Sequence, residues 1–350
     1  MKINLNRYMD ELEHVSCNAC GADDGDTFCK KERFGLPLNS VICKQCGLMY
    51  INPRPVKRMY QEFNKSDYRK AVSGTDEGIT RIFRQEVVTT QRSIIPFFKK
   101  HAGFDDPQML LDVGCSYGGI AGAFLERYRD LEACGVEPVE KNAEYATKRT
   151  RMNVTTGLFE DYVTENKFDI AIFAQAINHT LDPLANLKKI RSLLTDRGVL
   201  YLSIQDTVSA LLNRPLERMV EVNHPYMFCR ESIQYLVKKA GFEIIGYEDL
   251  LLDGDSLTRQ DIPRLRFPRI RILARKTEEK DDIERPDYKE IKRRITSNVN
   301  FREQWHETID KWHKTYTVKK IAEEDGSKIN AVINYLTYLS RRVYKRIFFK

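Results

Sequence analysis

Apolar segments of strand length alternate with segments of helical period through the middle of this 350-residue sequence. Five short apolar runs, bounded by turn residues, predict strands buried on both faces: 109–114, 133–138, 153–157, 168–174 and 198–204. Three stretches between them have the apolar spacing of amphipathic helices: 119–128, 139–149 and 183–194. This alternation predicts a parallel sheet with helices on both faces.

The predicted sheet ends differently from the way it begins. After a further amphipathic stretch, 230–241, two β-rich segments at 242–250 and 269–276 follow one another without a crossover helix. At least one pairing there must therefore be antiparallel. The sequence predicts an α/β fold with seven strands, mostly parallel, and an antiparallel last strand.

A ligand site is expected where the first strand ends. The stretch LLDVGCSYGG, residues 110–119, contains a turn of small residues that includes Gly114, Ser116 and Gly118. Such a turn lets backbone approach a ligand closely, and the following helix presents unpaired N–H groups. Glu137 ends the second strand, 23 residues after Gly114, where a ribose-binding acid belongs in nucleotide folds.

Two classes of cofactor suit this geometry, and the turn separates them. A nicotinamide or flavin site favours G-x-G-x-x-G, but Ser116 stands where the second glycine would be. The sequence resembles instead the class I S-adenosylmethionine-dependent methyltransferases. The resemblance covers roughly residues 80–276 and rests on motifs that occur in the expected order: LLDVGCSYGG, GVEP, GLFEDY, FDIAIFAQAINHTLDP, LLTDRGVLYLSI and HPYMFCRESIQYLVKKAGFEIIGYE.

The resemblance implies a Rossmann-like methyltransferase sheet and assigns the cofactor-binding residues. Asp112 and the turn from Gly114 through Ser116 to Gly118 would hold the methionine part of S-adenosylmethionine. Glu137 would accept hydrogen bonds from both ribose hydroxyls. Leu158, Phe159 and Glu160 would frame the adenine. Gln175 is a further candidate and, with Tyr226, would line the acceptor pocket.

Two histidines are candidates for the general base. Many relatives have Glu-His where this sequence has Asn178-His179, so an acid is missing. The unperturbed pKa of histidine, near 6.5, suits proton removal close to neutrality, and His224 lies in the loop expected to cover the site. For both histidines a purely supporting role stays open.

Four cysteines predict a structural zinc site near the N-terminus. Cys17 and Cys20 form one C-x-x-C pair, and Cys43 and Cys46 form a second, 22 residues further on. Two such pairs, each followed by glycine, supply four thiolates to tetrahedral Zn²⁺. Four reduced thiols without metal are the alternative. A closed four-cysteine site has no open position, so we expect it to support folding rather than catalysis.

The sequence therefore divides into three predicted parts: a zinc-ribbon-like module and linker (1–70), a methyltransferase domain (71–276) and a charged helical extension (277–350). This combination is similar to bacterial enzymes of polysaccharide, deoxysugar and secondary-metabolite pathways, some of which are sugar C-methyltransferases. The resemblance implies a small-molecule or glycan acceptor. A sugar hydroxyl is the first expectation, with N- or C-methylation open.

The net charge of +7 is concentrated toward the C-terminus, because the last ten residues carry five basic side chains and no acid. Apolar residues from Ile329 to Ile347 follow helical spacing beside Arg341, Arg342, Lys345, Arg346 and Lys350. A basic amphipathic helix can contact an anionic membrane or pack on protein. The sequence has no membrane-spanning run and no signal peptide, which favours a cytoplasmic protein, with peripheral contact at the inner face of the membrane as the open alternative.

Two other function classes compete. Zinc and basic charge also suit a nucleic-acid methyltransferase, but the fourth strand lacks the Asn/Asp-Pro-Pro-aromatic motif, and no basic stripe is interleaved with aromatic residues for stacking bases. Nucleic acid is therefore disfavoured as a partner. A non-catalytic module that only binds the cofactor is the other rival, and Asn178 is the single feature that favours it.

Overall fold

The computed structural model describes residues 5–62, 76–103, 106–212, 214–250, 268–278 and 282–315. The chain forms two compact units, Met1–Asn298 and Val299–Lys350. The sheet and the candidate sites below belong to the first unit. The three-part division at residues 70 and 276 stays a prediction.

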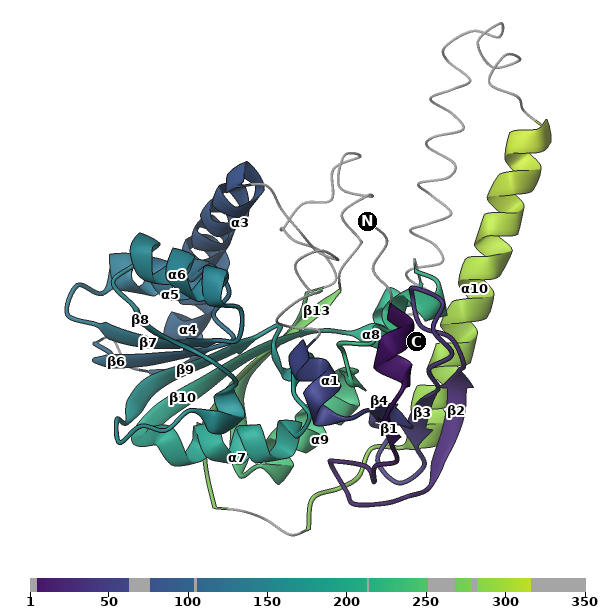
Figure 1. The fold of residues 1–350 in the computed structure, drawn as a ribbon, viewed down its shortest axis with the longest axis horizontal. Helices are drawn as coiled ribbons and strands as arrows, with labels where there is room; N and C mark the ends of the chain where they lie inside the picture. Colours follow the sequence, from purple (N-terminus) through teal and green to yellow (C-terminus); the bar gives the residue numbers. More distant parts are fainter. Residues whose placement is uncertain are drawn as a thin grey trace, which may run out of the picture. The chain divides into compact units, whose positions relative to one another are not determined.

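Seven strands form the central sheet in the order β12, β13, β10, β9, β6, β7, β8 (Figure 1). In the same order their bounds are Phe242–Leu250, Arg269–Lys276, Leu194–Gln205, Phe168–Ala174, Met109–Val113, Glu132–Glu137 and Asn153–Thr156. The pairings among β10, β9, β6, β7 and β8 are parallel, whereas β13 is antiparallel to both β10 and β12. The predicted fold class is confirmed, and the strand order reverses between β6 and β9.

One strand differs from its prediction. The segment 153–157 was expected to be buried on both faces, but β8 is the edge strand, and only Val154 is half-buried while its other three residues are exposed. Val154 is the single apolar side chain in the segment Asn-Val-Thr-Thr-Gly. That composition suits a strand with one solvated edge.

Helices cover both faces of the sheet. One face packs on α4 (Ile95–His101), α5 (Gly119–Arg127) and α6 (Glu140–Arg149). The other packs on α7 (Pro183–Leu193) and α9 (Arg230–Lys239). The four helices α5, α6, α7 and α9 lie where the apolar spacing predicts them.

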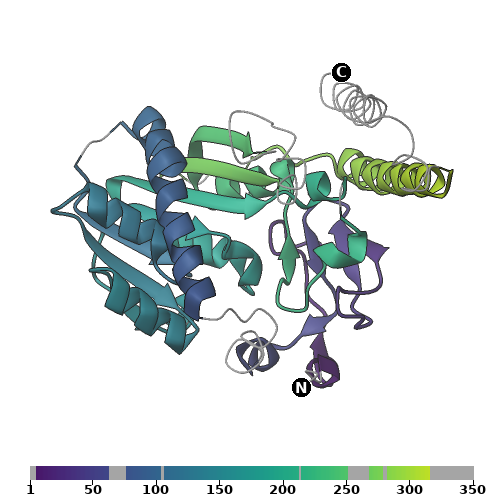
Figure 2. The ribbon, with the colours of Figure 1, turned by 90° about the horizontal axis from the view of Figure 1, so that it is seen from above.

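A long helical run lies across one side of the sheet and is dark blue in Figure 2. It comprises α3 (Asp76–Thr89), a π-helical turn η3 (Thr90–Ile94) and α4. Ile79, Phe83, Thr90 and Ile94 are its buried residues up to the end of the π turn. Single π turns within helices are frequent at functional sites.

The N-terminal module forms a second sheet of four strands, in the order β11, β4, β3, β2. Three of them come from the module itself: β2 (Gly25–Cys29), β3 (Ser40–Cys43) and β4 (Met49–Ile51). The fourth, β11 (Tyr226–Met227), comes from the loop that precedes α9, and it pairs Tyr226 with Tyr50 and Met227 with Met49. The module and the large domain thus share a sheet.

Shorter elements complete the first unit. β1 (Leu12–Glu13) pairs with β5 (Arg54–Pro55), and α1 (Lys57–Glu62) follows. The remaining helical elements are α8 (Thr207–Ala210) and the 3-10 turns Leu5–Met9, Phe159–Asp161, Ile177–His179 and Leu216–Met219.

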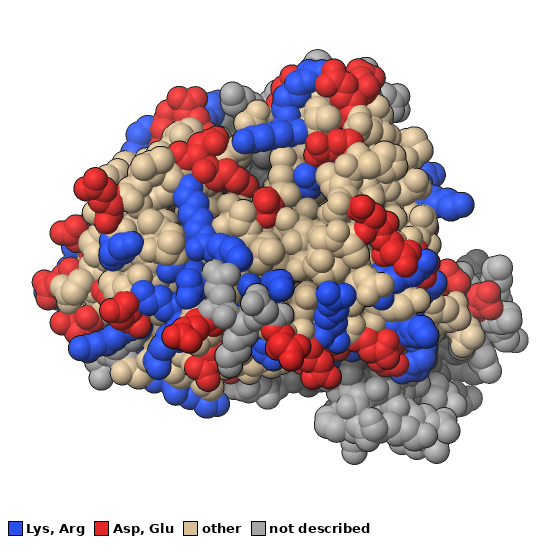
Figure 3. Space-filling view, turned by 90° about the horizontal axis from the view of Figure 1, so that it is seen from below, with Lys and Arg blue, Asp and Glu red and all other residues tan. Residues whose placement is uncertain are grey.

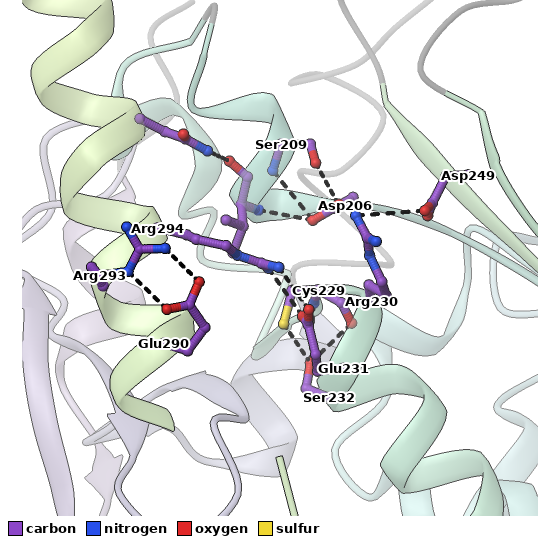
Figure 4. Close-up of polar contacts among 12 residues, drawn as sticks. Asp206, Ser209, Cys229, Arg230, Glu231, Ser232, Asp249, Glu290, Arg293 and Arg294 are labelled. Atoms are coloured by element: carbon purple, nitrogen blue, oxygen red, sulfur yellow. Dashed lines mark hydrogen bonds and ion pairs between the residues drawn. The ribbon is translucent and has the colours of Figure 1, made fainter. Parts of the chain in front are cut away.

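The last helix is α10 (Tyr288–Thr315), and its initial turns, up to Asn298, belong to the first unit and contact its other elements (Figure 4). Arg294 donates from Nη1 and Nη2 to the two carboxylate oxygens of Glu231, at 2.6 and 3.0 Å. Asn298 Nδ2 donates to the carbonyl of Val208 (2.8 Å). Ile291 packs so closely on Gly47 that a Cβ there would lie 2.3 Å from Ile291 Cδ1. These contacts join residues 288–298 to the cysteine module, to α8 and to α9.

The predicted amphipathic helix from Ile329 to Ile347 and its basic residues lie outside the described residues, so its membrane contact stays a prediction. Within the described ranges, no helix combines the length and the apolar character needed to cross a bilayer.

Candidate functional site

A cavity of about 650 Å³ opens at the carboxyl ends of β6, β7, β9 and β10. This is the edge at which parallel α/β sheets bind ligands, next to the reversal of strand order. Nine of the eleven predicted cofactor and catalytic residues line it: Asp112, Gly114, Ser116, Glu137, Leu158, Phe159, Glu160, Gln175 and His179. Gly118 and His224 do not line the cavity.

The turn after β6 is shaped for close backbone approach. Gly114 has φ +70°, and a Cβ there would lie 2.7 Å from the Cβ of Ala176. Ser116 adopts φ 49° although it is not glycine. Gly118 caps α5 with φ +77° and packs against Ala146. Gly114 and Ser116 therefore shape the cavity wall, while Gly118 supports it from behind.

Glu137 is fixed in place by backbone donors. Its Oε2 accepts a hydrogen bond from the N–H of Ser116 (2.9 Å), and its Oε1 accepts one from the N–H of Val139 (3.0 Å). The side chain is buried, which raises its pKa. Asn142 lines the cavity beside it, with Oδ1 buried and without a hydrogen-bond partner among the described residues. An acid held in this way presents its remaining lone pairs to hydroxyl donors.

Asp112 lies close to a second acid that the sequence analysis missed. Burial and the nearby charge of Glu86 raise the pKa of Asp112 to about 8. Glu86 comes from α3 and also lines the cavity, and burial raises its pKa to about 7. Asp112 is buried and Glu86 half-buried, and neither has a cationic partner in contact among the described residues, which favours a ligand that brings positive charge.

The turn after β8 forms another wall of the cavity. Leu158, Phe159 and Glu160 line it together. Lys189 of α7 donates to the carbonyls of Phe159 (2.7 Å) and Glu160 (2.9 Å). Asn186 donates to Glu160 Oε1 (2.9 Å). The predicted adenine-binding residues thus stand together on a turn held by α7.

Gln175 directly follows β9 and has a strained backbone conformation. Its φ is 54°, a region that residues other than glycine seldom occupy. Its N–H donates to the carbonyl of Ser203 (2.7 Å), and its Nε2 donates to Ser203 Oγ (3.2 Å). Gln175 and Ser116 are the positive-φ residues other than glycine in the described chain, and both line the cavity. Strained residues of this kind cluster at ligand sites.

The two histidines lie one behind the other. His179 lines the cavity, and His224 contacts it edge to face with a ring-centroid distance of 4.3 Å. Asn223 Nδ2 lies 3.4 Å from His179 Nδ1. Burial lowers the pKa of His179 to about 3 and that of His224 to about 4. Both rings are therefore neutral at pH 7.

Tyr226, expected in the acceptor pocket, lies behind its wall instead. Its hydroxyl donates to the carbonyl of Leu181 (3.2 Å). Arg54 of the N-terminal module donates from Nη1 to the same carbonyl (2.9 Å) and to the Tyr226 hydroxyl (3.1 Å). Leu181 lines the cavity. The reason for the difference is β11, which ties Tyr226 to the module's sheet.

The four predicted metal ligands lie together. The sulfur atoms of Cys17, Cys20, Cys43 and Cys46 are all within 4.8 Å of one another. Two pairs across the knuckles, Cys17 with Cys46 and Cys20 with Cys43, are 3.5 Å apart. A zinc tetrahedron with bonds of about 2.3 Å has sulfur–sulfur edges of roughly 3.8 Å. The cluster therefore fits zinc.

The local backbone matches this chemistry. Gly21 and Gly47 adopt φ +76° and +69° after the second cysteine of each pair, as the sequence predicts. The N–H of Gln45 points at Cys43 Sγ (3.4 Å). Hydrogen bonds from neighbouring thiols lower the pKa values of Cys20 and Cys43 and raise those of Cys17 and Cys46. Crowded thiols of this kind gain most from a cation that makes all four thiolates.

Further residues of the cavity were missed, although the sequence carries a signal for some of them. Glu86 follows Ile79 and Phe83 on the inward stripe of α3, an unusual place for an acid. Arg269 and Arg271 alternate with isoleucines in RIRILARK, which places both on one face of β13. Lys57 and Tyr60 also line the cavity, but the sequence carries no signal for them. The fold of the N-terminal module alone places their helix, α1, at the cavity.

Comparison with known proteins agrees with this architecture. Residues 84–246 match a family described as a methyltransferase domain. Among curated proteins, (S)-coclaurine N-methyltransferase of Papaver somniferum is 25% identical over 115 residues, which is 31% of this chain and 33% of that protein. N-methyltransferase 4 of the same plant is 25% identical over 125 residues, 33% of this chain and 35% of that protein. The chain thus spans about a third of the length of these relatives.

A solved structure of an S-adenosylmethionine-dependent methyltransferase from Clostridium acetobutylicum ATCC 824 superposes with a TM-score of 0.42 at 14% identity, covering 54% of this chain and 91% of that one. The family match covers β6, β7, β8, β9 and β10 and most of the residues that line the cavity, whereas β13 lies beyond it. Residues 84–246 thus match a methyltransferase-domain family, and they contain the parallel strands that border the cavity.

Proposed function

We propose that this protein transfers a methyl group from S-adenosylmethionine to a small-molecule acceptor, with a sugar hydroxyl as the first candidate. One observation carries the proposal: a single cavity joins the predicted cofactor residues at the ends of β6, β7 and β8 to a polar region at the ends of β9, β10 and β13. A methyl donor and its acceptor need such a shared, enclosed space, because transfer requires in-line positioning.

The cofactor residues have distinct proposed roles. Glu137, held by Ser116 and Val139, accepts hydrogen bonds from the ribose hydroxyls. Phe159 and Glu160 frame the adenine. Asp112 and Glu86 face the positive charge that the methionine part brings. When bound, S-adenosylmethionine supplies an electrophilic methyl group whose bonding electrons leave with sulfur.

The acceptor side provides a proton acceptor. An acceptor hydroxyl oxygen forms the new bond to carbon and must lose its proton, and His179 is the proposed recipient at the cavity wall. A weakly basic imidazole suffices, because a methylated hydroxyl that still carries its proton is strongly acidic. His224 and Asn223 position the ring.

A second candidate reaction is N-methylation. The two plant relatives are named as N-methyltransferases, and an amine acceptor can use the same neutral His179. Nucleic acid is a weaker candidate, because basic and acidic side chains are interspersed on the face shown in Figure 3 and form no continuous basic stripe there.

We also propose that the cysteine cluster binds one structural Zn²⁺. The geometry of the four thiols supports this. Metal analysis of the purified chain should give one zinc per molecule, and Cys46→Ser should lose it. Cys29→Ser is the matched control, since Cys29 is buried in the same module and donates to the carbonyl of Lys31 instead. Zinc-free wild-type protein would contradict the assignment.

The function is tested in two steps. Calorimetric titration with S-adenosylmethionine should show one site, weakened at least tenfold by Glu137→Gln and unchanged by Glu140→Gln, which neutralises an exposed acid three residues away and outside the cavity. Transfer from methyl-labelled cofactor into small-molecule, glycan and nucleic-acid pools then identifies the acceptor class. Label confined to nucleic acid would contradict the proposal, and binding without transfer would favour a non-catalytic module.

A further inference from the structure

The cavity contains two arginines as well as its acids, and the strand order separates the two kinds of charge. Asp112 and Glu137 end β6 and β7, whereas Arg269 and Arg271 enter from β13. Two strands, β9 and β10, stand between β6 and β13. The arginines therefore belong to the acceptor side of the proposed methyl-transfer site.

Arg271 has a structural role. Its guanidinium donates to the carbonyl of Ser93 (3.2 Å) and to Ser93 Oγ (2.5 Å), and it lies 3.7 Å from the carboxylate of Glu248. Its side chain is only 7% exposed. These contacts hold the π turn against β13, and they supply the positive charge of Arg271 with an anionic partner and hydrogen-bond acceptors.

Arg269 has no such partners in the part of the chain that the structure describes. It is half-buried, lines the cavity and begins β13 on the same face as Arg271. Glu86 of α3 and Tyr201 of β10 line the same cavity, yet neither forms an ion pair or hydrogen bond with Arg269. A half-buried guanidinium is costly unless an anion pairs with it.

An unpartnered hydroxyl lies on the same wall. Thr90 begins the π turn, is fully buried and lines the cavity, and its Oγ1 has no hydrogen-bond partner among the described residues. Arg271 contacts Ser93 and Arg275 contacts the carbonyl of Ala102 (2.9 Å), so the helical run and β13 proceed in the same direction. Thr90 precedes Ser93 along the helical run, and Arg269 precedes Arg271 along β13. Thr90 and Arg269 therefore lie on the same side of the contact between Ser93 and Arg271.

We propose that this wall is an anion-binding subsite: the acceptor carries a carboxylate or phosphate group that pairs with Arg269 and accepts a hydrogen bond from Thr90. Planar guanidinium groups bind both kinds of anion through paired N–H donors. The substrate class is then an acidic small molecule, such as an acidic or phosphorylated sugar. The inference rests on the proposed methyl transfer, which supplies the reason for an acceptor to lie there.

The test uses two simple probes. Inorganic phosphate and acetate are titrated separately into the full chain, with and without S-adenosylhomocysteine, and binding is followed by NMR line broadening. We expect at least one anion to bind in the millimolar range and Arg269→Gln to weaken it tenfold or more. Arg269→Lys should retain part of the affinity. Arg275→Gln, which removes the same charge from the far end of the same strand, should bind as the wild type does.

The outcomes separate the subsite from the proposed function. Equal anion binding by wild type and Arg269→Gln, or no binding by either, overturns the subsite even if the cofactor binds. Failure of S-adenosylhomocysteine to bind contradicts the proposed function, while the anion titration of the ligand-free chain still tests Arg269. Tighter binding of phosphate or of acetate identifies the acid group. A methylated product that passes uncharged through an anion exchanger at neutral pH would also overturn the subsite.

Discussion

The imidazole ring of His179 meets that of His224 edge to face, 4.3 Å between centroids, and only His179 borders the cavity. Burial keeps both rings neutral, with pKa values lowered to about 3 and about 4. In this pair one ring borders the cavity and the other packs behind it.

His179→Gln should lower kcat by roughly 100-fold or more, the usual contribution of a positioned acid or base, and leave the affinity for S-adenosylmethionine unchanged. His224→Gln should have a smaller effect, and His101→Gln none, because His101 packs against Phe97 outside the cavity, with the two rings tilted by 57°. The wild-type kcat should be flat from about pH 6 to 9, since both pKa values lie below that range. A kinetic pKa near 6.5 that disappears in His179→Gln would contradict the buried, neutral ring.

Cofactor affinity should rise with pH. Burial raises the pKa of Glu86 to about 7 and that of Asp112 to about 8, and a positively charged ligand favours the ionised acids. Binding should therefore release protons below about pH 8, measurable by calorimetry in buffers of different ionisation enthalpy. Glu86→Gln should remove part of this release. A cofactor affinity that is independent of pH between 6 and 9 would show that these acids do not interact with the cofactor.

The same acids set the stability of the ligand-free protein. Their folded-state pKa values lie above the ordinary values of 4.5 and 3.8, so the folded chain holds protons that the unfolded chain has lost. The free energy of unfolding should fall as pH rises from about 4 to 8, and Asp112→Asn should raise the Tm at pH 8. Thermal unfolding across this range checks the sign, and a Tm advantage of Asp112→Asn over the wild type that is no larger at pH 8 than at pH 5 would contradict it.

Arg54→Met should impair the acceptor side of the site without weakening cofactor binding. The substitution leaves the carbonyl of Leu181 and the hydroxyl of Tyr226 without their shared donor, at a cost of roughly 2 kcal/mol in the free energy of unfolding. Chemical denaturation and the KM for acceptor measure the two effects. Arg58→Met is the control, since Arg58 pairs with Glu11 on the surface.

Removal of the proposed zinc should be felt beyond the cysteine module. Because β11 pairs with β4, loss of the module's order should expose the backbone amides of residues 220–229. Hydrogen exchange after chelation, or in Cys46→Ser, should show faster exchange in this segment, whereas Cys29→Ser should leave it protected. Unchanged protection in the metal-free protein would show that the module's sheet holds without metal.

Much of this architecture is readable from local pattern. The central strands β6, β7, β9, β10 and β13 coincide with apolar runs because burial on both faces forces continuous apolar sequence. β8 departs from that rule because an edge strand needs little apolar surface. The glycine turn, Glu137 and the C-x-x-C pairs are local motifs, so their positions at the cavity and in the cluster follow from sequence. Arg269 and Glu86 could not be predicted as cavity residues from local pattern, because their place there depends on which helix packs against which strand.

β11 could not be predicted from the sequence for a different reason. Two residues, Tyr226 and Met227, give no periodicity, and their partners in β4 lie in a distant part of the chain. Tyr226 was therefore expected at the acceptor, whereas pairing with Tyr50 turns its hydroxyl toward Arg54. Only the tertiary contact decides between the two environments.

The shared sheet has a consequence for biosynthesis and engineering. During translation the cysteine module leaves the ribosome long before Tyr226 and Met227. The edge of its sheet at β4 therefore stays unpaired until β11 has been synthesised. For the same reason the first 62 residues should not be replaced on their own by the module of a related protein. A chimaera must include residues 220–229 from the same donor protein.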